Sequence, residues 1–289
     1  MGYVFGLISA FCFGSGAVLY RLGQRALPHD DGHWLSNLIN AVLFGGLAIM
    51  VTWPAWNLSG FTVLVVAGIS GTVLGRFSLL RGIRLIGATR GNTFQAATPM
   101  IAAAFGWMLL GETITVLEAM GGTLTIFGLV RIARSRGDDE AKRGADLAGY
   151  LVACGGPLFF GIAFVLRKWG LERYPGSVTG AFIGSAAGIM VLSLREAGQG
   201  RLGMRIRDGM TRQAWPFVAA GVITTAALLT QFLALERVEA WVVGILVGTS
   251  ALWTAALSMI VLPHDERVTM ALLANIGIVF AGITVIAVG

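Results

Sequence analysis

Residues 81–112, RGIRLIGATRGNTFQAATPMIAAAFGWMLLGE, decide the fold that the sequence predicts. The stretch begins with arginines and continues as a largely apolar run over 90–110, which ends at Gly111-Glu112. A helix that crosses the hydrocarbon core of a bilayer needs about 20 such residues. The run therefore predicts a membrane-spanning helix with a basic segment before it.

Polar residues interrupt this predicted helix on one side only. Asn92, Gln95 and Thr98 recur at three-residue spacing, so they share one face of a helix. Pro99 follows and removes a backbone N–H from the same segment. Because lipid cannot satisfy these polar groups, the face should either line a water-filled transport path or hydrogen-bond to neighbouring helices.

The composition extends this interpretation to the whole chain. Of its 289 residues, 56% are hydrophobic and only 12% are charged, whereas a soluble domain carries about 25% charge. We therefore expect an all-α integral membrane protein. The basic residues behind the net charge of +6 lie in short gaps between apolar runs, which indicates membrane orientation rather than nucleic-acid binding. Cys12 and Cys154 lack paired-ligand spacing, so we predict neither a metal site nor a cofactor.

Apolar segments of spanning length recur ten times along the chain. Turn residues separate them, as at Tyr174-Pro175-Gly176. The longest polar breaks are 134–146 and 196–213, and the first divides the helices into five and five. The predicted helices are 2–21, 34–53, 60–80, 90–110, 114–133, 147–167, 177–195, 214–235, 240–262 and 267–288.

The two groups of five helices are similar in sequence. Since five is an odd number, the second copy must lie upside down in the membrane, an arrangement typical of secondary transporters. We therefore predict two inverted repeats, 1–135 and 147–289, joined by a charged linker over 136–146. An offset of 147 residues carries the similarity and matches Gly2, Tyr3, Phe13 and Gly14 with Gly149, Tyr150, Phe160 and Gly161.

Short motifs in the first repeat resemble one family. Thr98-Pro99 in the fourth predicted helix, Leu110-Gly111-Glu112 after it, and Gly121 and Gly128 in the next helix are similar to the drug/metabolite transporter superfamily, EamA type. The resemblance covers essentially the whole chain, and it implies ten helices and transport of a small solute. Within the superfamily the chain looks most similar to bacterial amino-acid and metabolite exporters. The second repeat departs from the pattern, since Ser250-Ala251 replaces Thr-Pro.

Basic residues in the loops predict the orientation of the chain. Sixteen Lys and Arg residues lie in loops after the odd-numbered predicted helices, and four lie on the opposite side. The richer side should face the cytoplasm, which puts both termini outside, although the family resemblance implies both termini inside. We follow the charges. The four residues on the poorer side are Arg167, Lys168, Arg173 and Arg237.

Several residues inside predicted helices are candidates for a substrate site. Arg76 could bind a substrate carboxylate, or it could snorkel or pair structurally. Hydroxyls beside Trp253 suit a cavity for apolar or aromatic side chains, and hydrogen bonding between helices explains residues such as Gln231 equally well. The candidate lining residues are Arg76, Asn92, Gln95, Thr98, Gln231, Thr249, Ser250 and Trp253.

Two further polar residues have a structural role in this interpretation. Glu112 and Thr115 lie at the start of the helix predicted over 114–133. A carboxylate or hydroxyl there accepts hydrogen bonds from free backbone N–H groups. We therefore expect both residues to cap that helix.

These features predict a secondary transporter of the inner membrane that works by alternating access between the repeats. The resemblance, with the character of Arg76 and Trp253, implies outward transport of a small zwitterion such as an amino acid. Proton coupling, exchange and facilitated diffusion all remain open. The alternatives are a carrier of cationic drugs, nucleotide sugars or polyamines, and a membrane enzyme or structural subunit. We expect no enzyme, because the chain has no G-x-S-x-G, H-E-x-x-H or Walker A motif.

The expected partners follow from the same interpretation. They are a small-molecule substrate and membrane lipid, without nucleic acid. Ten helices suffice to enclose a transport path, so a monomer is the simplest expectation.

Overall fold

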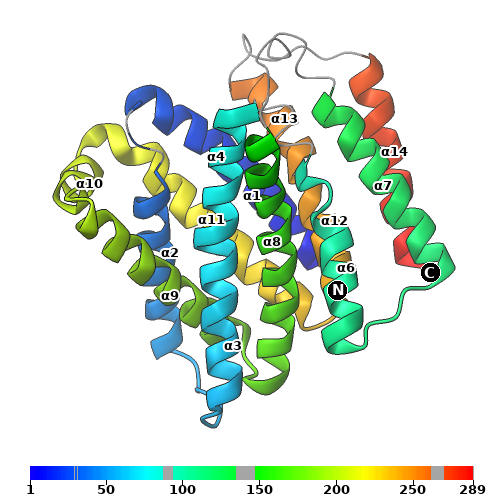
Figure 1. Ribbon diagram of the computed structural model, residues 1–289, viewed down its shortest axis with the longest axis horizontal. Coiled ribbons are helices and arrows are strands. Elements are labelled where there is room, and N and C mark those ends of the chain that lie inside the picture. Colours follow the sequence, from blue (N-terminus) through cyan, green and yellow to red (C-terminus); the bar gives the residue numbers. More distant parts are fainter. Residues whose placement is uncertain (29, 31, 87–93, 135–146, 262–269, 289) are drawn as a thin grey trace.

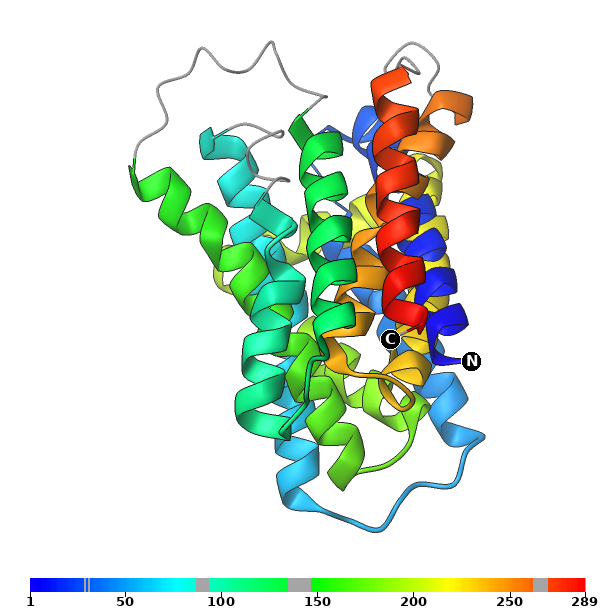
Figure 2. The same ribbon diagram turned by 90° about the vertical axis from the view of Figure 1, so that its right-hand side faces the viewer.

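The computed structural model describes residues 1–28, 30, 32–86, 94–134, 147–261 and 270–288, and within these ranges the chain forms helices and no strand (Figures 1 and 2). The first half of the chain contains α1 (Gly2–Ala26), α2 (His33–Ile49), α3 (Leu58–Gly68), the π-helix η1 (Ile69–Gly75), α4 (Arg76–Ile86), α6 (Thr98–Leu110) and α7 (Val116–Arg134). The second half contains α8 (Leu147–Arg173), α9 (Ser177–Gly198), α10 (Leu202–Gly209), the 3-10 helix η2 (Arg212–Ala214), α11 (Trp215–Leu235), α12 (Ala240–Gly248), α13 (Ser250–Val261) and α14 (Met270–Val288).

Length and apolar character show that this is a multi-pass membrane protein. Large apolar side chains stay exposed on the outside of the bundle, among them Trp107 at 68% and Ile260 at 77%. Lipid can cover such surfaces, whereas water would disfavour them. Six stretches of helix among the described residues are long and apolar enough to cross a membrane: Gly2–Ala26, Leu58–Gly82, Leu147–Arg173, Ser177–Gly198, Arg212–Leu235 and Ala240–Ser258. Ten spanning helices remain a prediction.

Two predicted helices differ from the observed ones at internal positions. In the described part of the segment predicted over 90–110, a turn at Ala96 and Ala97 separates helical Phe94 and Gln95 from α6, which starts at Thr98. Pro99 therefore lies in the first turn, where its missing N–H would have had no helical partner. The segment predicted over 240–262 divides at Thr249, whose hydroxyl donates to the Leu246 carbonyl at 2.6 Å.

Several helices end later than predicted: α1 continues to Ala26 instead of residue 21, and the helical segment predicted over 60–80 continues to Ile86. The sixth predicted helix ends at residue 167, but α8 continues to Arg173 and ends before Tyr174. Arg167 and Lys168 are therefore helical residues and not part of a loop. Residues counted on the richer side, such as Arg25 at the end of α1 and Arg84 in α4, are helical as well, so the helical assignment does not favour either side of the charge comparison.

The capping predictions have two outcomes. Thr115 caps α7 as predicted, because its hydroxyl accepts from the Glu118 N–H at 3.2 Å while its own N–H donates to Glu118 Oε2 at 2.8 Å. Glu112 also caps a helix, but not the following helix α7 as predicted. The carboxylate of Glu112 accepts from the Ala240 N–H at 2.8 Å, so it caps α12 in the other half of the chain.

The most extensive helix–helix interfaces join helices of the first half to helices of the second half (Figure 1). α1 runs along α11 and touches α12 and α13, while α8 runs along α3, η1 and α4 and touches α6. α7 and α14 form a separate pair at one edge. α12 lies at the centre, where every residue from Ala240 to Leu246 is buried, as expected of a helix that is apolar all round.

The two chain ends lie near each other (Figure 2). The Tyr3 hydroxyl of α1 donates to the Ile286 carbonyl of α14 at 3.5 Å. Helices that begin and end together in this way put both termini on one side of a membrane. Which side that is remains a prediction.

Candidate functional site

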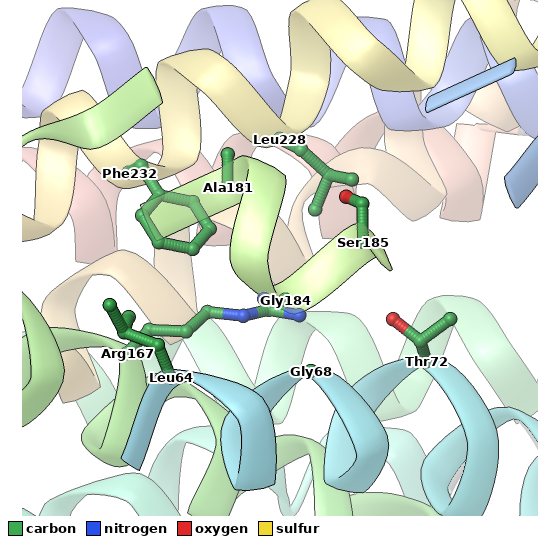
Figure 3. Close-up of a pocket in the computed structure, with 9 residues that line it drawn as sticks. All are labelled: Leu64, Gly68, Thr72, Arg167, Ala181, Gly184, Ser185, Leu228 and Phe232. Carbon is green, nitrogen blue, oxygen red and sulfur yellow. The ribbon is translucent and has the colours of Figure 1, made fainter. Parts of the chain in front are cut away.

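A small, partly open pocket with a mixed polar and apolar lining lies where helices of the two halves of the chain meet. α3 and η1 form its first-half wall, and α8, α9 and α11 form the opposite wall. In this conformation it has room for about one water molecule rather than for a metabolite. The pocket is lined by Leu64, Gly68, Thr72, Arg167, Ala181, Gly184, Ser185, Leu228 and Phe232 (Figure 3).

Arg167 is the charged residue of this pocket. Figure 3 shows its side chain extended across the space, with the guanidinium pointing toward Thr72. Nη1 donates to Gln231 Oε1 at 2.6 Å, and the guanidinium carbon lies 5.7 Å from the centroid of the Phe232 ring. Both contacts are with neutral groups. Among the described residues no carboxylate pairs with Arg167, so this half-buried charge has no counter-ion in the described part of the chain.

Two hydroxyls face the same space with hydrogen-bonding capacity to spare. Ser185 is 6% exposed and lies on α9, and Thr72 lies on η1 opposite. Neither hydroxyl hydrogen-bonds to another residue in the described part of the chain. A hydroxyl can donate to an anion and accept from a cation. Together with Arg167 they form a group of polar side chains in which some hydrogen-bond donors have no acceptor among the described residues.

Glycines bring the two walls of the pocket together. A Cβ on Gly68 would collide with the backbone of Gly184, so α3 and α9 touch there without intervening side chains. A Cβ on Gly71 would come within 2.9 Å of Arg167 Nη2, so glycine at this position makes room for the guanidinium. Gly71 belongs to the π-helix η1, and such irregular turns occur often at functional sites.

Comparison with known proteins identifies the chain. The sequence model of the EamA-like transporter family matches residues 1–134 and 147–288. The chain belongs to this family. A solved structure titled only "Crystal structure of protein" covers 99% of this chain and 97% of its own, with a TM-score of 0.73 and 17% sequence identity, which shows a shared fold. No curated protein matches.

The EamA-like transporter is thus a membrane transporter of the drug/metabolite superfamily, and its predicted site residues can be placed in it. Gln231 lies at the pocket through its hydrogen bond to Arg167 and is only 2% exposed. Arg76 lies elsewhere, because its guanidinium carbon stacks 4.7 Å from the centroid of the Tyr20 ring on α1. Its Nε is buried without a hydrogen-bond partner.

The candidates of the fourth predicted helix lie against α8 instead. Gln95 contacts Gly156, and its Nε2 is buried without a partner. Thr98 is 8% exposed, and its carbonyl lies close to Gly161. Asn92 falls outside the described residues. Gln95 and Thr98 thus pack against α8, the helix that carries Arg167, but they do not line the Arg167 pocket.

The candidates of the ninth predicted helix pack on α1. Ser250 and Trp253 lie close to Gly14, and the Trp253 ring meets the Phe11 ring edge to face at 5.2 Å. Thr249 is 2% exposed, lies between α12 and α13, and donates its hydroxyl to the Leu246 carbonyl of α12. Among the described candidates, Gln231 alone contacts Arg167, although it is not itself a lining residue of the pocket, and the others lie at different interfaces.

Sequence reasoning missed Arg167 because it assigned this residue to a loop. A signal for its true position was present. The turn residues Tyr174-Pro175-Gly176 mark where the chain must leave the helix, and no proline separates Arg167 from them. A helix drawn up to that turn would have placed Arg167 within a spanning segment, where an ionisable residue is a functional candidate by default.

A second charged contact lies one residue further along α8. Lys168 Nζ lies 3.0 Å from Glu112 Oε1 and donates to the Val238 carbonyl at 3.1 Å. Glu112 comes from the connection between α6 and α7, so this contact joins the two halves. Glu112 Oε2 is buried without a partner. The contact closes the bundle on the side of the α12 N-terminus.

Proposed function

We propose that this EamA-like transporter is a secondary transporter of the inner membrane, which exports amino acids and related small metabolites. The solute moves by alternating access through a path between two inverted repeats of five transmembrane helices. Gradients drive the transport, and a monomer suffices to enclose the path.

The pattern of helix packing supports the inverted repeat. In that arrangement α1 corresponds to α8, and α11 corresponds to the continuous segment Leu58–Gly82. The long contact of α1 with α11 then has its counterpart in the contact of α8 with α3, η1 and α4. Likewise the contact of α1 with α12 and α13 mirrors that of α8 with α6. Such correspondence between contacts is expected when one unit is used twice.

One observation carries the proposal: a pocket with polar side chains in its lining lies where the first-half helices meet the second-half helices. Thr72 comes from one half, and Arg167 and Ser185 come from the other. Secondary transporters built from inverted repeats bind their solutes at this kind of interface. Relative movement of the halves would open or close such a site without breaking either half.

A cysteine-blocking experiment tests this path without damaging the fold. Cys12 and Cys154 are replaced by Ala, and Ser185→Cys is introduced, with Thr284→Cys on the exposed face of α14 as the matched control. Purified protein in proteoliposomes should take up labelled amino acids in a saturable manner. A thiol reagent should abolish uptake by Ser185→Cys and spare Thr284→Cys, and a transported amino acid should slow the labelling.

Three other results would count against the proposal. Uptake that persists after complete labelling of Ser185→Cys would place the path elsewhere. Uptake of a cationic drug, polyamine or nucleotide sugar without any amino acid would favour the alternative carriers. A wild-type protein that moves none of these solutes would favour an enzyme or a structural subunit.

A further inference from the structure

We propose that Arg167 binds the carboxylate of the transported solute. The substrates are then small molecules with one carboxylate, which includes amino acids and other short carboxylic acids. This inference rests on the proposed function and deepens it, because it names the chemical group that the site recognises and the residue that does so.

The charge of the half-buried Arg167 lacks a carboxylate partner among the described residues, in contrast with the buried Arg205. Arg205 is 9% exposed, and its guanidinium lies 2.6 Å from Asp30 Oδ1 and 3.1 Å from Glu196 Oε2. Two carboxylates therefore neutralise Arg205. Arg167 contacts only the amide of Gln231 and the ring of Phe232 in the described part of the chain. A guanidinium left in this state inside a membrane protein is suited to an anion that arrives from outside.

The neighbours of Arg167 fix its orientation and leave part of it available. Gln231 uses Nη1, and the Phe232 ring lies within range of a cation–π contact. Gly71 has no side chain that could press on Nη2. A guanidinium binds a carboxylate through two parallel N–H···O bonds, for which a fixed plane and free N–H groups are required. The pocket provides both.

The charge of the pocket also limits which anion fits. Arg167 is its single cation, and the hydroxyls of Thr72 and Ser185 add neutral donors. The adjacent Lys168 is already paired with Glu112. One positive charge matches one carboxylate, whereas the diphosphate of a nucleotide sugar would stay partly uncompensated. A cationic drug or polyamine would be repelled. The charge of the pocket therefore disfavours nucleotide sugars as well as cationic drugs and polyamines.

The size of the pocket indicates when the solute binds. Its present room for about one water molecule is too small for a carboxylate. The walls meet where Gly68 touches Gly184, without interlocking side chains. Separation of α3 from α9 at this contact would expose Arg167, Thr72 and Ser185 together, so carboxylate binding is coupled to movement of the two halves.

Competition for uptake tests the recognised group directly. Wild-type protein in proteoliposomes takes up a labelled amino acid, and three competitors are compared: the same acid unlabelled, its methyl ester and the amine that lacks the carboxylate. We expect the ester and the amine to compete about 10- to 100-fold more weakly than the acid, which is the effect of losing charge-assisted hydrogen bonds. Equal competition by the ester or the amine would overturn the inference.

Substitutions then test the residue. Arg167→Gln should lose saturable uptake, with Arg173→Gln as the matched control, because Arg173 is an exposed residue of the same helix that stacks on Trp169. Gln231→Glu keeps the shape of the side chain but places a carboxylate where the amide now accepts from Arg167. It should therefore raise the KM for carboxylic acids by about tenfold or more, without loss of folded protein. Unchanged KM in Gln231→Glu would overturn the inference even if Arg167→Gln failed to fold.

A binding measurement separates this inference from the proposed function. The melting temperature of purified wild-type protein is measured with a panel of short carboxylic acids and with the matched amides. A rise with the acids alone supports carboxylate binding even if no amino acid is transported, in which case only the proposed function fails. No difference between acids and amides would overturn the inference and leave amino-acid transport to be judged from the uptake assay.

Discussion

Lys168 of α8 and Glu112 between α6 and α7 form an ion pair with an N–O distance of 3.0 Å across the two halves of the chain. Their side chains are 18% and 5% exposed, respectively. The same Glu112 oxygen accepts from the Ala240 N–H at the start of α12. Because a helix N-terminus and an ammonium group both favour a carboxylate, this single residue connects three segments. The pair is therefore a structural connection between the halves rather than a surface ion pair.

Replacement of Glu112 should destabilise the protein. Glu112→Gln leaves Lys168 without a counter-ion while an amide oxygen can still accept from Ala240, so we expect a loss of about 1–3 kcal/mol. Thermal unfolding of the purified protein measures it. Glu172→Gln is the matched control, since Glu172 is exposed on the same helix as Lys168, and its effect should stay within about 0.5 kcal/mol. Equal melting temperatures for the two variants would contradict the prediction.

The contact between Gly68 and Gly184 predicts an asymmetric response to alanine. A Cβ on Gly68 would collide with the backbone of Gly184, whereas a Cβ on Gly184 would lie 3.5 Å from the Gly68 Cα, an ordinary contact. Gly68→Ala should therefore destabilise by about 1–3 kcal/mol through overpacking, while Gly184→Ala should be tolerated. Melting temperatures and folded yields of the two variants decide this. The expectation fails if Gly184→Ala is the more damaging change.

The capping box of α7 predicts a smaller effect. Thr115→Ala removes the hydroxyl that accepts from the Glu118 N–H at 3.2 Å, and the loss of such a cap costs about 1 kcal/mol. Thr123→Ala provides the comparison, because the Thr123 hydroxyl is exposed and donates to the Ala119 carbonyl within the helix. The melting temperature should fall in Thr115→Ala and stay close to that of the wild type in Thr123→Ala. A fall of the same size in both variants would assign the effect to helix α7 as a whole.

The distribution of basic residues predicts the orientation of the chain. Both termini should lie outside, because the loops rich in Lys and Arg should face the cytoplasm. A reporter enzyme that is active only outside the inner membrane should be active when fused after residue 289 and inactive when fused within 136–146. A fluorescent reporter that folds only in the cytoplasm should give the opposite pattern. Reversal of both patterns would put the termini in the cytoplasm.

The helical membrane fold could be predicted from the sequence because membrane insertion depends on long apolar segments, which are visible in the sequence. It located helix ends less reliably. Hydropathy falls after Leu166 because Arg167 and Lys168 follow, although the backbone of α8 continues to the turn at Tyr174. Pro99 follows a real interruption, because a turn at Ala96 and Ala97 precedes α6 and Pro99 lies in the first turn of that helix. Helix ends depend on hydrogen bonds and turns, which hydropathy does not report.

The candidate site was only partly predictable, for a related reason. Gln231 was expected either to line a cavity or to hydrogen-bond between helices, and it accepts a hydrogen bond from Arg167 of α8. The position of Trp253 against Phe11 on α1 could not be inferred. It depends on which helices become neighbours in space, and residue spacing within one helix contains no such information.

The touching backbones at Gly68 and Gly184 have a consequence for how such a protein could acquire a new solute. A wall made of main chain has no side chain to lengthen or shorten, so its dimensions cannot be adjusted by point mutation without displacing a whole helix. If the proposed site is correct, a change of specificity would instead occur at the side chains beside it, Thr72, Ser185 and Leu228. The main-chain contact would then stay constant while these side chains diversify.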